Sequence, residues 1–358
     1  MSKRHRPGVS AASVLRHVEE VVVATSGEDT FEIVFAVAAA RIAVAREMPL
    51  RRAIAEAVRR HPVLDVDPVA DASDALLARV DDLLASALQD ESTLDAVFES
   101  LVPRVAKSDK GQFFTPRHVV DFVVRMLAPA KRECVVDPAC GSGAFLSHAR
   151  AAGARAHGCD VDPRAVRVAR LLALAAGADP RTVQRADGLR DAELPAADVV
   201  ATNPPFAGRA PAEGFDVARL VRTPERDVLF LERALGLLRP GGRLGIVLPY
   251  NKASGAAFAA LRRWLVERAR VLAIVGLPRE TFLPHTSQRT FVLFAQKRER
   301  VLELAAASPD ERTMLVVSER AGKDTGGEPV FRSDGDLDHD LDDVAAELRP
   351  FLDAEGFA

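Results

Sequence analysis

The sequence TNPPF at residues 202–206 places an amide side chain, two consecutive prolines and an aromatic ring directly after an apolar run. None of these residues is suited to extend a strand or to begin a helix. Because proline fixes φ and lacks a backbone N–H, two prolines in succession make a rigid turn. We expect this turn to hold Asn203 and an exposed Phe206 still over a bound molecule.

A second motif, DPACGSGAFL at residues 137–146, follows a predicted strand and opens a predicted helix. Gly141 and Gly143 allow the backbone to approach a ligand closely, and the following helix N-terminus offers free N–H groups for a nucleotide. Asp160 ends the next predicted strand about 20 residues later, where an acid can accept ribose hydroxyls. Asp160 could instead be a surface acid beside a helix cap, but its distance from the glycine-rich turn favours the ribose role.

The glycine-rich turn differs from the common nucleotide-binding sequences. No GxxxxGK[ST] follows any predicted strand, which argues against triphosphate chemistry of the P-loop type. Asp137 and Pro138 precede the turn, and Asp137 could meet an ammonium group. A nucleoside that carries an amino-acid cation therefore fits this turn better than a pyrophosphate does.

Two kinds of predicted element surround these motifs. Apolar residues recur at spacings of three and four residues without strand-like alternation up to about residue 105, which predicts helices at 10–23, 29–45, 49–60 and 71–89. From about residue 130, short Val/Ile/Leu runs alternate with helical segments, as in a sheet with helices on both faces. Seven predicted strands fit one doubly wound domain: 133–137, 154–160, 182–186, 198–202, 243–249, 271–278 and 289–296.

Composition narrows the class of protein. A chain of 358 residues predicts two domains, or one large domain with additions, and 48% hydrophobic residues can form a sizeable core. The longest apolar stretch, residues 31–45, carries charges and is too short for a bilayer span. No apolar segment of signal-peptide type follows the basic start of the sequence, so we expect a cytoplasmic protein without membrane contact.

Cys134, Cys140 and Cys159 lack metal-site or disulfide spacing, so we expect buried apolar cysteines and no metal. A net charge of −3 neither favours nor excludes a nucleic-acid partner.

Taken together, the motifs resemble the N6-adenine DNA methyltransferases, and most closely the methylation (M) subunit of type I restriction-modification systems. The motifs that carry this resemblance over about residues 105–297 are GQFFTPRHVV (111–120), DPACGSGAFL, GCDVDP (158–163), ADGL (186–189) and TNPPF. The resemblance implies an α/β fold, a Rossmann-like seven-stranded class I S-adenosylmethionine-dependent methyltransferase domain at 106–300. An all-helical N-terminal domain at 1–105 would precede it, and a short C-terminal extension with an acidic tail would follow at 301–358.

The extension contains one further predicted strand, at residues 313–319, and ends in DGDLDHDLDD and a short predicted helix. Because this end is rich in acidic residues, we expect it to be solvated rather than functional.

The resemblance also implies S-adenosyl-L-methionine as the cofactor. At its methionine end would lie Gln112, Phe113, Phe114, Thr115, Pro116 and Arg117, and the turn beneath it would comprise Asp137, Ser142, Gly143 and Ala144. Asp160 would hold the ribose, and Asp187 with Gly188 would meet the adenine ring of the cofactor.

For the catalytic turn, the implied target is the N6 amine of adenine, whose lone pair is delocalised into the ring. The side-chain oxygen of Asn203 and the backbone carbonyl of Pro204 would each accept one N6–H bond, which localises the lone pair toward the methyl donor. Pro204 and Pro205 would keep the turn rigid. Phe206 would stack on the target base, which must leave the duplex to reach the site.

Other substrates stay open. A similar tetrapeptide serves methyltransferases that act on glutamine side chains, on RNA guanine amines or on the N4 amine of cytosine, and GQFFTP with the helical N-terminal region favours DNA adenine. A non-catalytic module that binds S-adenosylmethionine or DNA is a further alternative. His285 and Arg289 could touch DNA, although a solvated loop is favoured there.

No region suited to reading base sequence is apparent. About 60 residues separate the glycine-rich turn from Asn203, which leaves no room for a further domain, and the chain beyond residue 300 is short and acidic. We therefore expect DNA as substrate, a separate specificity subunit as partner, and leave open a restriction subunit.

Overall fold

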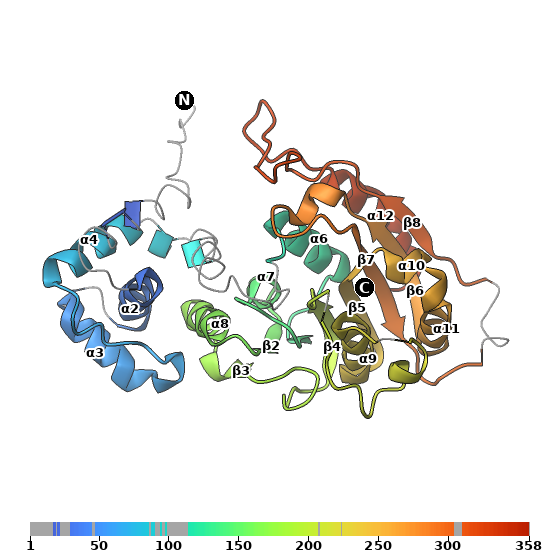
Figure 1. The fold of residues 1–358 in the computed structure, drawn as a ribbon, viewed down its shortest axis with the longest axis horizontal. Coiled ribbons are helices and arrows are strands. Elements are labelled where there is room, and N and C mark those ends of the chain that lie inside the picture. The colour runs from blue at the N-terminus through green and yellow to red at the C-terminus, as the bar shows by residue number, and fades with distance from the viewer. Residues whose placement is uncertain are drawn as a thin grey trace. The chain divides into compact units, whose positions relative to one another are not determined.

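The computed structural model describes residues 17–18, 20–21, 29–44, 47–85, 87–89, 94, 97–98, 114–206, 208–222, 224–303 and 310–357. The chain forms two compact units, one of residues 1–109 and 162–183 and one of residues 110–161 and 184–358 (Figure 1). In the described ranges, no helix has the length and apolar composition needed to cross a bilayer. Most of the helix predicted at 10–23 lies outside the described residues.

The first unit is helical, as the sequence predicts. Its elements are α2 (Thr30–Ala43), α3 (Leu50–Arg60), η1 (Pro62–Leu64), α4 (Asp74–Leu84), η2 (Ala87–Gln89), α8 (Pro163–Ala175) and η3 (Pro180–Thr182). Asp29 caps α2, where its carboxylate accepts the Phe31 N–H at 3.0 Å. The rings of Phe31, Phe35 and Phe98 pack together with centroids 5.6 to 6.1 Å apart and form the aromatic core of this unit.

Helix α8 belongs to this helical unit although it follows the second strand in sequence. The Arg167 guanidinium donates to both carboxylate oxygens of Glu32, at 2.8 and 2.7 Å, and lies 4.4 Å from the centre of the Phe35 ring. Arg170 donates to the carbonyl of Val63 at 2.8 Å. The proposed domain boundary between residues 105 and 106 therefore leaves out a helix that packs with those preceding it.

The second unit contains a sheet of eight strands in the order β3-β2-β1-β4-β5-β7-β6-β8. The strands are β1 (Cys134–Asp137), β2 (Arg155–Asp160), β3 (Val183–Arg185), β4 (Ala197–Thr202), β5 (Leu238–Pro249), β6 (Ala269–Gly276), β7 (Thr290–Lys297) and β8 (Met314–Val317). All seven predicted strands of the doubly wound domain are confirmed. The sheet has one more strand than expected, because β8 of the C-terminal extension pairs in parallel with β6.

The strand directions bring the sequence motifs to one edge of the sheet. Strands β1, β2, β4 and β5 are parallel, and β7 runs antiparallel between β5 and β6. The carboxyl ends of β1, β2, β4, β5 and β6 therefore lie at the same edge. In parallel α/β sheets, ligands bind at this edge.

Helices cover both faces of the central strands. The described helices of this unit are α6 (Arg117–Leu127), α7 (Ala144–Ala151), α9 (Arg226–Leu237), α10 (Asn251–Ser254), α11 (Ala259–Arg268) and α12 (Leu341–Ala354), with the short turns η4 (Val217–Arg219), η5 (Ala256–Phe258) and η6 (Arg279–Phe282). On β5, Gly245 faces α6, and a side chain there would meet Leu127 at 2.8 Å. The alternate residues Leu244 and Ile246 join an apolar cluster with residues of α9 and α11.

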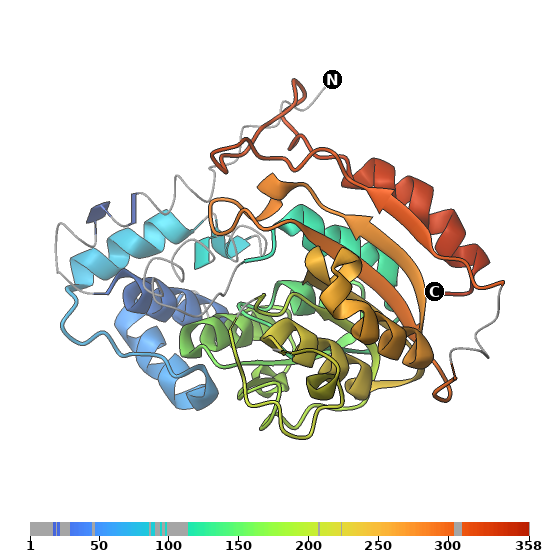
Figure 2. The same ribbon diagram turned by 45° about the vertical axis from the view of Figure 1, so that its right-hand side comes forward.

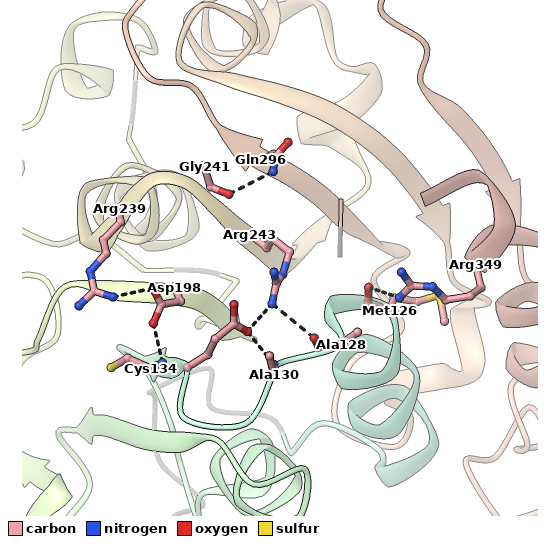
Figure 3. A network of polar contacts seen from close by, with 11 residues as sticks. Met126, Ala128, Ala130, Cys134, Asp198, Arg239, Gly241, Arg243, Gln296 and Arg349 are labelled. Carbon is pink, nitrogen blue, oxygen red and sulfur yellow. Dashed lines mark hydrogen bonds and ion pairs between the residues drawn. The ribbon is translucent and has the colours of Figure 1, made fainter. Parts of the chain in front are cut away.

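A polar network fixes the opposite, amino-terminal edge of the sheet (Figure 3). Arg243 on β5 pairs with Glu133 at 2.5 Å, and the carboxylate of Asp198 on β4 accepts the Cys134 N–H at 2.8 Å and pairs with Arg239 at 2.5 Å. The start of β1 is thus tied to its neighbour β4, and the residue before it is tied to β5, the next strand in the sheet. Side-chain charges are paired at this edge, whereas the glycine-rich turn and TNPPF follow strands at the carboxyl edge.

The C-terminal end is not the solvated tail that its composition suggests. Helix α12 runs along β8 and contacts α6, and its apolar residues Leu341, Val344, Ala345, Leu348 and Leu352 are buried (Figure 2). Arg125 on α6 pairs with Asp342 at 2.6 Å. The expectation of a solvated end agrees with residues 328–336, which are exposed, but it is wrong for α12, because apolar residues spaced by three and four give this helix a face that packs on the unit.

Candidate functional site

The turn at residues 203–206, which we call the Asn-Pro-Pro turn, leaves the carboxyl end of β4. The side-chain amide of Asn203 donates to the hydroxyl of Thr115 at 2.8 Å. Thr115 is buried and lies two residues before Arg117, at which α6 begins. The start of α6 therefore sets the orientation of Asn203.

This orientation leaves an acceptor available inside the site. The side-chain oxygen Oδ1 of Asn203 is buried and has no hydrogen-bond partner among the described residues. An unsatisfied buried acceptor costs about 1–3 kcal/mol, and such groups in a folded protein call for an explanation. A donor supplied by a ligand, such as an amine N–H, would satisfy it.

Phe206 is not the exposed aromatic that the sequence suggested. Its side chain is 2% exposed, and its ring packs edge-to-face against Phe282 of η6, with ring centroids 5.6 Å apart and planes at 86°. Pro204 is buried as well, and Pro205 is partly buried. A turn on its own predicts exposure, but here the loop between β6 and β7 supplies an apolar partner for the ring, and burying an aromatic ring is favourable.

The glycine-rich turn joins the ends of β1 and β2. Gly141 and Gly143 have positive φ, of 52° and 92°, and Gly143 precedes α7 without a side-chain cap. The Gly141 N–H donates to the carboxylate of Asp160 at 2.9 Å. Asp160 is buried, so the alternative of a surface acid is wrong. Ser142 is buried in the turn, and Ala144, the first residue of α7, is partly buried.

Asp137 lies at the end of β1 with its side chain 1% exposed. It accepts the Ala139 N–H at 3.0 Å. Burial raises the pKa of Asp137 to about 7, and the nearby charge of Asp160 acts in the same direction. A cation placed beside Asp137 would favour the charged carboxylate and lower this pKa.

The ADGL segment packs directly on the turn that follows β1. A side-chain carbon at Gly188 would lie 1.9 Å from the backbone oxygen of Pro138, so only glycine fits this position. The Ala186 N–H donates to the backbone oxygen of Asp160 at 3.1 Å, and Asp187 accepts the Leu189 N–H at 3.0 Å. These contacts bring Asp187 and Gly188 beside the turn that also holds Asp137.

The two groups of predicted residues lie at the ends of adjacent strands. Val135 and Val136 of β1 pair with Val199 and Val200 of β4, so the glycine-rich turn and the Asn-Pro-Pro turn leave the same edge side by side. Phe114 and Arg117 are partly buried near Thr115, whereas Gln112 and Phe113 lie outside the described residues. His285 and Arg289 are exposed in the loop between β6 and β7.

A buried lysine that the sequence analysis did not predict lies just after the end of β5 and pairs with two acidic side chains. Lys252, 3% exposed, follows β5 and pairs with Glu225 at 2.5 Å and Asp227 at 3.1 Å. Burial raises the pKa of Asp227 to about 6, against the opposing effect of Lys252. An antiparallel bridge joins Glu225 to Arg209, so this cluster fixes the chain that follows the Asn-Pro-Pro turn. No local sequence pattern connects Lys252 with Asp227, because they come from different elements.

Comparison with known proteins agrees with this geometry. Residues 89–323 match the family described as N-6 DNA Methylase. The methylase subunit of the type I restriction enzyme EcoEI from Escherichia coli is 25% identical over 258 residues, which are 64% of this chain and 51% of that subunit. The chain therefore spans about half the length of this curated relative.

Two solved structures share the fold. A putative class I S-adenosylmethionine-dependent methyltransferase from Listeria monocytogenes is 17% identical, with a TM-score of 0.60 over 90% of this chain and 98% of that chain. A modification subunit of a putative type I restriction enzyme from Vibrio vulnificus is 18% identical, with a TM-score of 0.61 over 96% of this chain and 90% of that chain.

These similarities confirm the predicted Rossmann-like class I methyltransferase fold, with eight strands rather than seven. The family match covers more than half of the chain, and the fold brings the sequence motifs to one edge of the sheet. The chain therefore belongs to the N-6 DNA Methylase family.

Proposed function

We propose that this chain transfers a methyl group from S-adenosyl-L-methionine to the N6 amine of an adenine in DNA. The observation that carries the proposal is the side chain of Asn203, which is held by Thr115 and presents a buried oxygen without a partner among the described residues. An exocyclic amine with two N–H groups is the donor that such a site accepts. The family match and the methylase subunits among the relatives support this choice of substrate.

The residues at the ends of β1 and β2 suit this cofactor. A side-chain carbon at Gly141 would meet no atom within 4 Å, so the space above this residue is open. Asp137 is a buried acid that gains from a cation such as the cofactor's ammonium group, and Asp160 is an acid for its ribose. We propose that Ser142, Gly143 and Ala144 line the turn beneath the cofactor. S-adenosyl-L-methionine supplies a methyl group made electrophilic by its sulfonium.

We further propose the remaining cofactor contacts by family resemblance. Asp187 and Gly188 would meet the adenine ring of the cofactor. The methionine end would be lined by Gln112, Phe113, Phe114, Thr115, Pro116 and Arg117. The hydrogen bond from Asn203 gives Thr115 a second role, in which it connects the cofactor side of the site with the amine side.

Methyl transfer in this proposal depends on positioning and electrostatics. Asn203 Oδ1 and the carbonyl of Pro204 accept the two N6–H bonds, which concentrates the nitrogen lone pair outside the ring. Pro204 and Pro205 restrict the turn so that both acceptors keep their directions. The amine then faces the methyl donor without further rearrangement of the chain.

The target base must leave the duplex, which costs a few kcal/mol in unstacking and unpairing. We propose that it stacks on Phe206. In the structure this ring is buried against Phe282, so a base can stack on it only when a neighbouring group gives way.

We propose that a separate specificity subunit reads the DNA sequence, because the relatives of this chain include methylase subunits of type I restriction enzymes. A restriction subunit would complete such a system. An enzyme that modifies DNA works in the compartment of the DNA, for which we propose the cytoplasm.

The test is to map modified bases in DNA from cells with and without the gene, and with Asn203→Ala. We expect N6-methyladenine at defined sites only with the unchanged chain, while purified Asn203→Ala still binds S-adenosyl-L-methionine. N4-methylcytosine in its place would redirect the proposal to the sister reaction. Methylation unaffected by Asn203→Ala would refute the assigned role, and site-specific methylation by the purified chain alone would refute the need for a partner.

A further inference from the structure

Residues 319–340, which we call the C-terminal segment, fold back on themselves after β8. An antiparallel bridge joins Ala321 to His339. The carboxylate of Asp340 accepts the hydroxyl of Ser318 at 2.5 Å. The two ends of the segment are therefore tied together beside β8, and the part between them projects as one folded piece.

The C-terminal segment contacts the loop that carries Phe282. The Lys323 ammonium donates to the backbone oxygen of Leu283, the next residue along, at 2.7 Å. Gly327 lies against the same peptide, since a side-chain carbon there would be 2.9 Å from the carbonyl carbon of Leu283 and 2.8 Å from the nitrogen of Pro284. The loop is thus held from outside by a charged donor and by close backbone packing.

The same segment also contacts the start of α6. The imidazole of His339 stacks on that of His118, with ring centroids 4.9 Å apart and planes at 14°. His118 is hydrogen-bonded to the backbone of Ala321, and burial lowers its pKa to about 4, so it is uncharged at neutral pH. His118 lies three residues after Thr115.

The contacts of Lys323 and His339 lie next to Phe282 and near Thr115, the two residues that contact the Asn-Pro-Pro turn. Phe282, which precedes Leu283, packs against Phe206, and Thr115 orients Asn203. We propose that Lys323 and His339 are positioning residues of the methyl-transfer site, which act through Leu283 and His118. This inference rests on the proposed function and adds a role for a segment whose acidic composition suggested none.

The size of the effect follows from geometry. Reacting groups must be held close to their productive arrangement, and a displacement of about 1 Å can reduce a rate by about 100-fold. Lys323 and His339 touch neighbours of the reacting groups, so we expect partial losses. Because each acts through another residue, binding of cofactor and DNA should change less than the rate of transfer.

The first experiment measures single-turnover methylation by the enzyme purified with its partners. Lys323→Met keeps the aliphatic stem and removes the donor, and we expect the rate to fall about tenfold with cofactor and DNA affinities nearly unchanged. Lys323→Arg should restore most of the rate. The matched control is Arg332→Met, because Arg332 donates to the carbonyl of Leu337 within the segment itself, at 3.2 Å.

The second experiment addresses the stacked rings. His339→Ala removes the ring, whereas His339→Phe keeps a flat ring for stacking, and both lose the hydrogen bond from the Leu341 N–H. We expect a several-fold lower rate for His339→Ala and a rate close to the unchanged enzyme for His339→Phe. Equal losses in both variants would overturn the role of the stack.

A third measurement does not depend on methylation. In Lys323→Met, the amides of His285 and Thr286, which donate to the Phe282 carbonyl, should exchange hydrogen faster, and the amides of β7 should exchange at an unchanged rate. In Arg332→Met, the exchange rates of all these amides should stay unchanged. Unchanged exchange would overturn the proposal. The proposal would also be overturned if Lys323→Met lowered only the DNA affinity and this decrease became smaller at higher salt, because Lys323 would then be a phosphate contact. Absence of any methylation by the unchanged enzyme would refute the proposed function, and hydrogen exchange would still decide whether Lys323 holds the loop.

Discussion

Asn203 Nδ2 donates to Thr115 Oγ1 at 2.8 Å, and this single hydrogen bond joins two segments that lie 88 residues apart in sequence. Because one end of the amide is fixed by Thr115, the direction of the other end, Oδ1, is fixed as well. TNPPF therefore supplies the donor and GQFFTP the acceptor of this bond, and the Asn203 oxygen that would face the substrate is oriented before the substrate binds.

Thr115→Val removes the acceptor while nearly preserving the shape of the side chain. We expect the single-turnover rate of methylation to fall about 10- to 100-fold, because Asn203 loses its fixed orientation. Cofactor affinity, measured by calorimetry, should stay nearly unchanged. Thr115→Ser keeps the hydroxyl and should retain most of the rate. An equal loss of rate and cofactor affinity in Thr115→Val would instead assign Thr115 to the cofactor alone.

Gly188→Ala tests the packing of ADGL on the turn after β1. The added methyl group would collide with the backbone oxygen of Pro138, which cannot move as a side chain can. We expect the free energy of unfolding to fall by about 3 kcal/mol, as for an overpacked interior. Gly236→Ala is the control, since a methyl group there meets no atom within 4 Å and alanine suits helix α9. Urea unfolding of both variants should show a loss for the first and a small gain for the second.

Asp137 makes stability depend on pH. Its pKa is raised to about 7 by burial, so the folded protein keeps a proton that the unfolded chain releases near pH 4. The folded state binds more protons between these values, so the free energy of unfolding should fall as pH rises through that window, by up to about 4 kcal/mol. Asp137→Asn should flatten this dependence in urea unfolding between pH 5 and 8. Asp191→Asn, at an exposed acid, should leave the dependence as it is.

The same acid should link cofactor binding to pH. If the cofactor's ammonium group meets Asp137, binding favours the charged carboxylate and releases a proton from it. Cofactor affinity should then rise between pH 6 and about 7.5, below the usual α-amino pKa. Calorimetry in buffers of different ionisation enthalpy measures the released proton. A pH dependence that persists in Asp137→Asn would show that another group is responsible.

Lys252 balances the charge of the buried Asp227 carboxylate, and replacing Lys252 should lower the stability of the protein. In Lys252→Met, the carboxylate of Asp227, which is fully buried, loses its cation, and we expect a loss of about 3–5 kcal/mol in unfolding free energy at pH 8. The loss should be smaller at pH 5, because the pKa of Asp227 is already raised to about 6. The double variant Lys252→Met with Asp227→Asn should recover most of the stability. A double variant as unstable as the single one would contradict this account.

The sequence by itself determined the strands, the glycine-rich turn and the rigid Asn-Pro-Pro turn. These depend on neighbours within a few residues: apolar runs for strands, the φ restriction of proline, and the conformational freedom of Gly141 and Gly143. The order of the motifs also indicated the family and hence the edge of the sheet at which they would meet.

Only the tertiary structure decided the partners of these residues. The burial of Phe206 against Phe282, the bond between Thr115 and Asn203, and the packing of α12 on α6 all join segments far apart in sequence. Residue types set how favourable burial or a hydrogen bond would be, but not which surface is available. That depends on how the strands align and which loops leave the same edge, and so the acidic C-terminal end, read by composition as solvated, became part of the fold around the site.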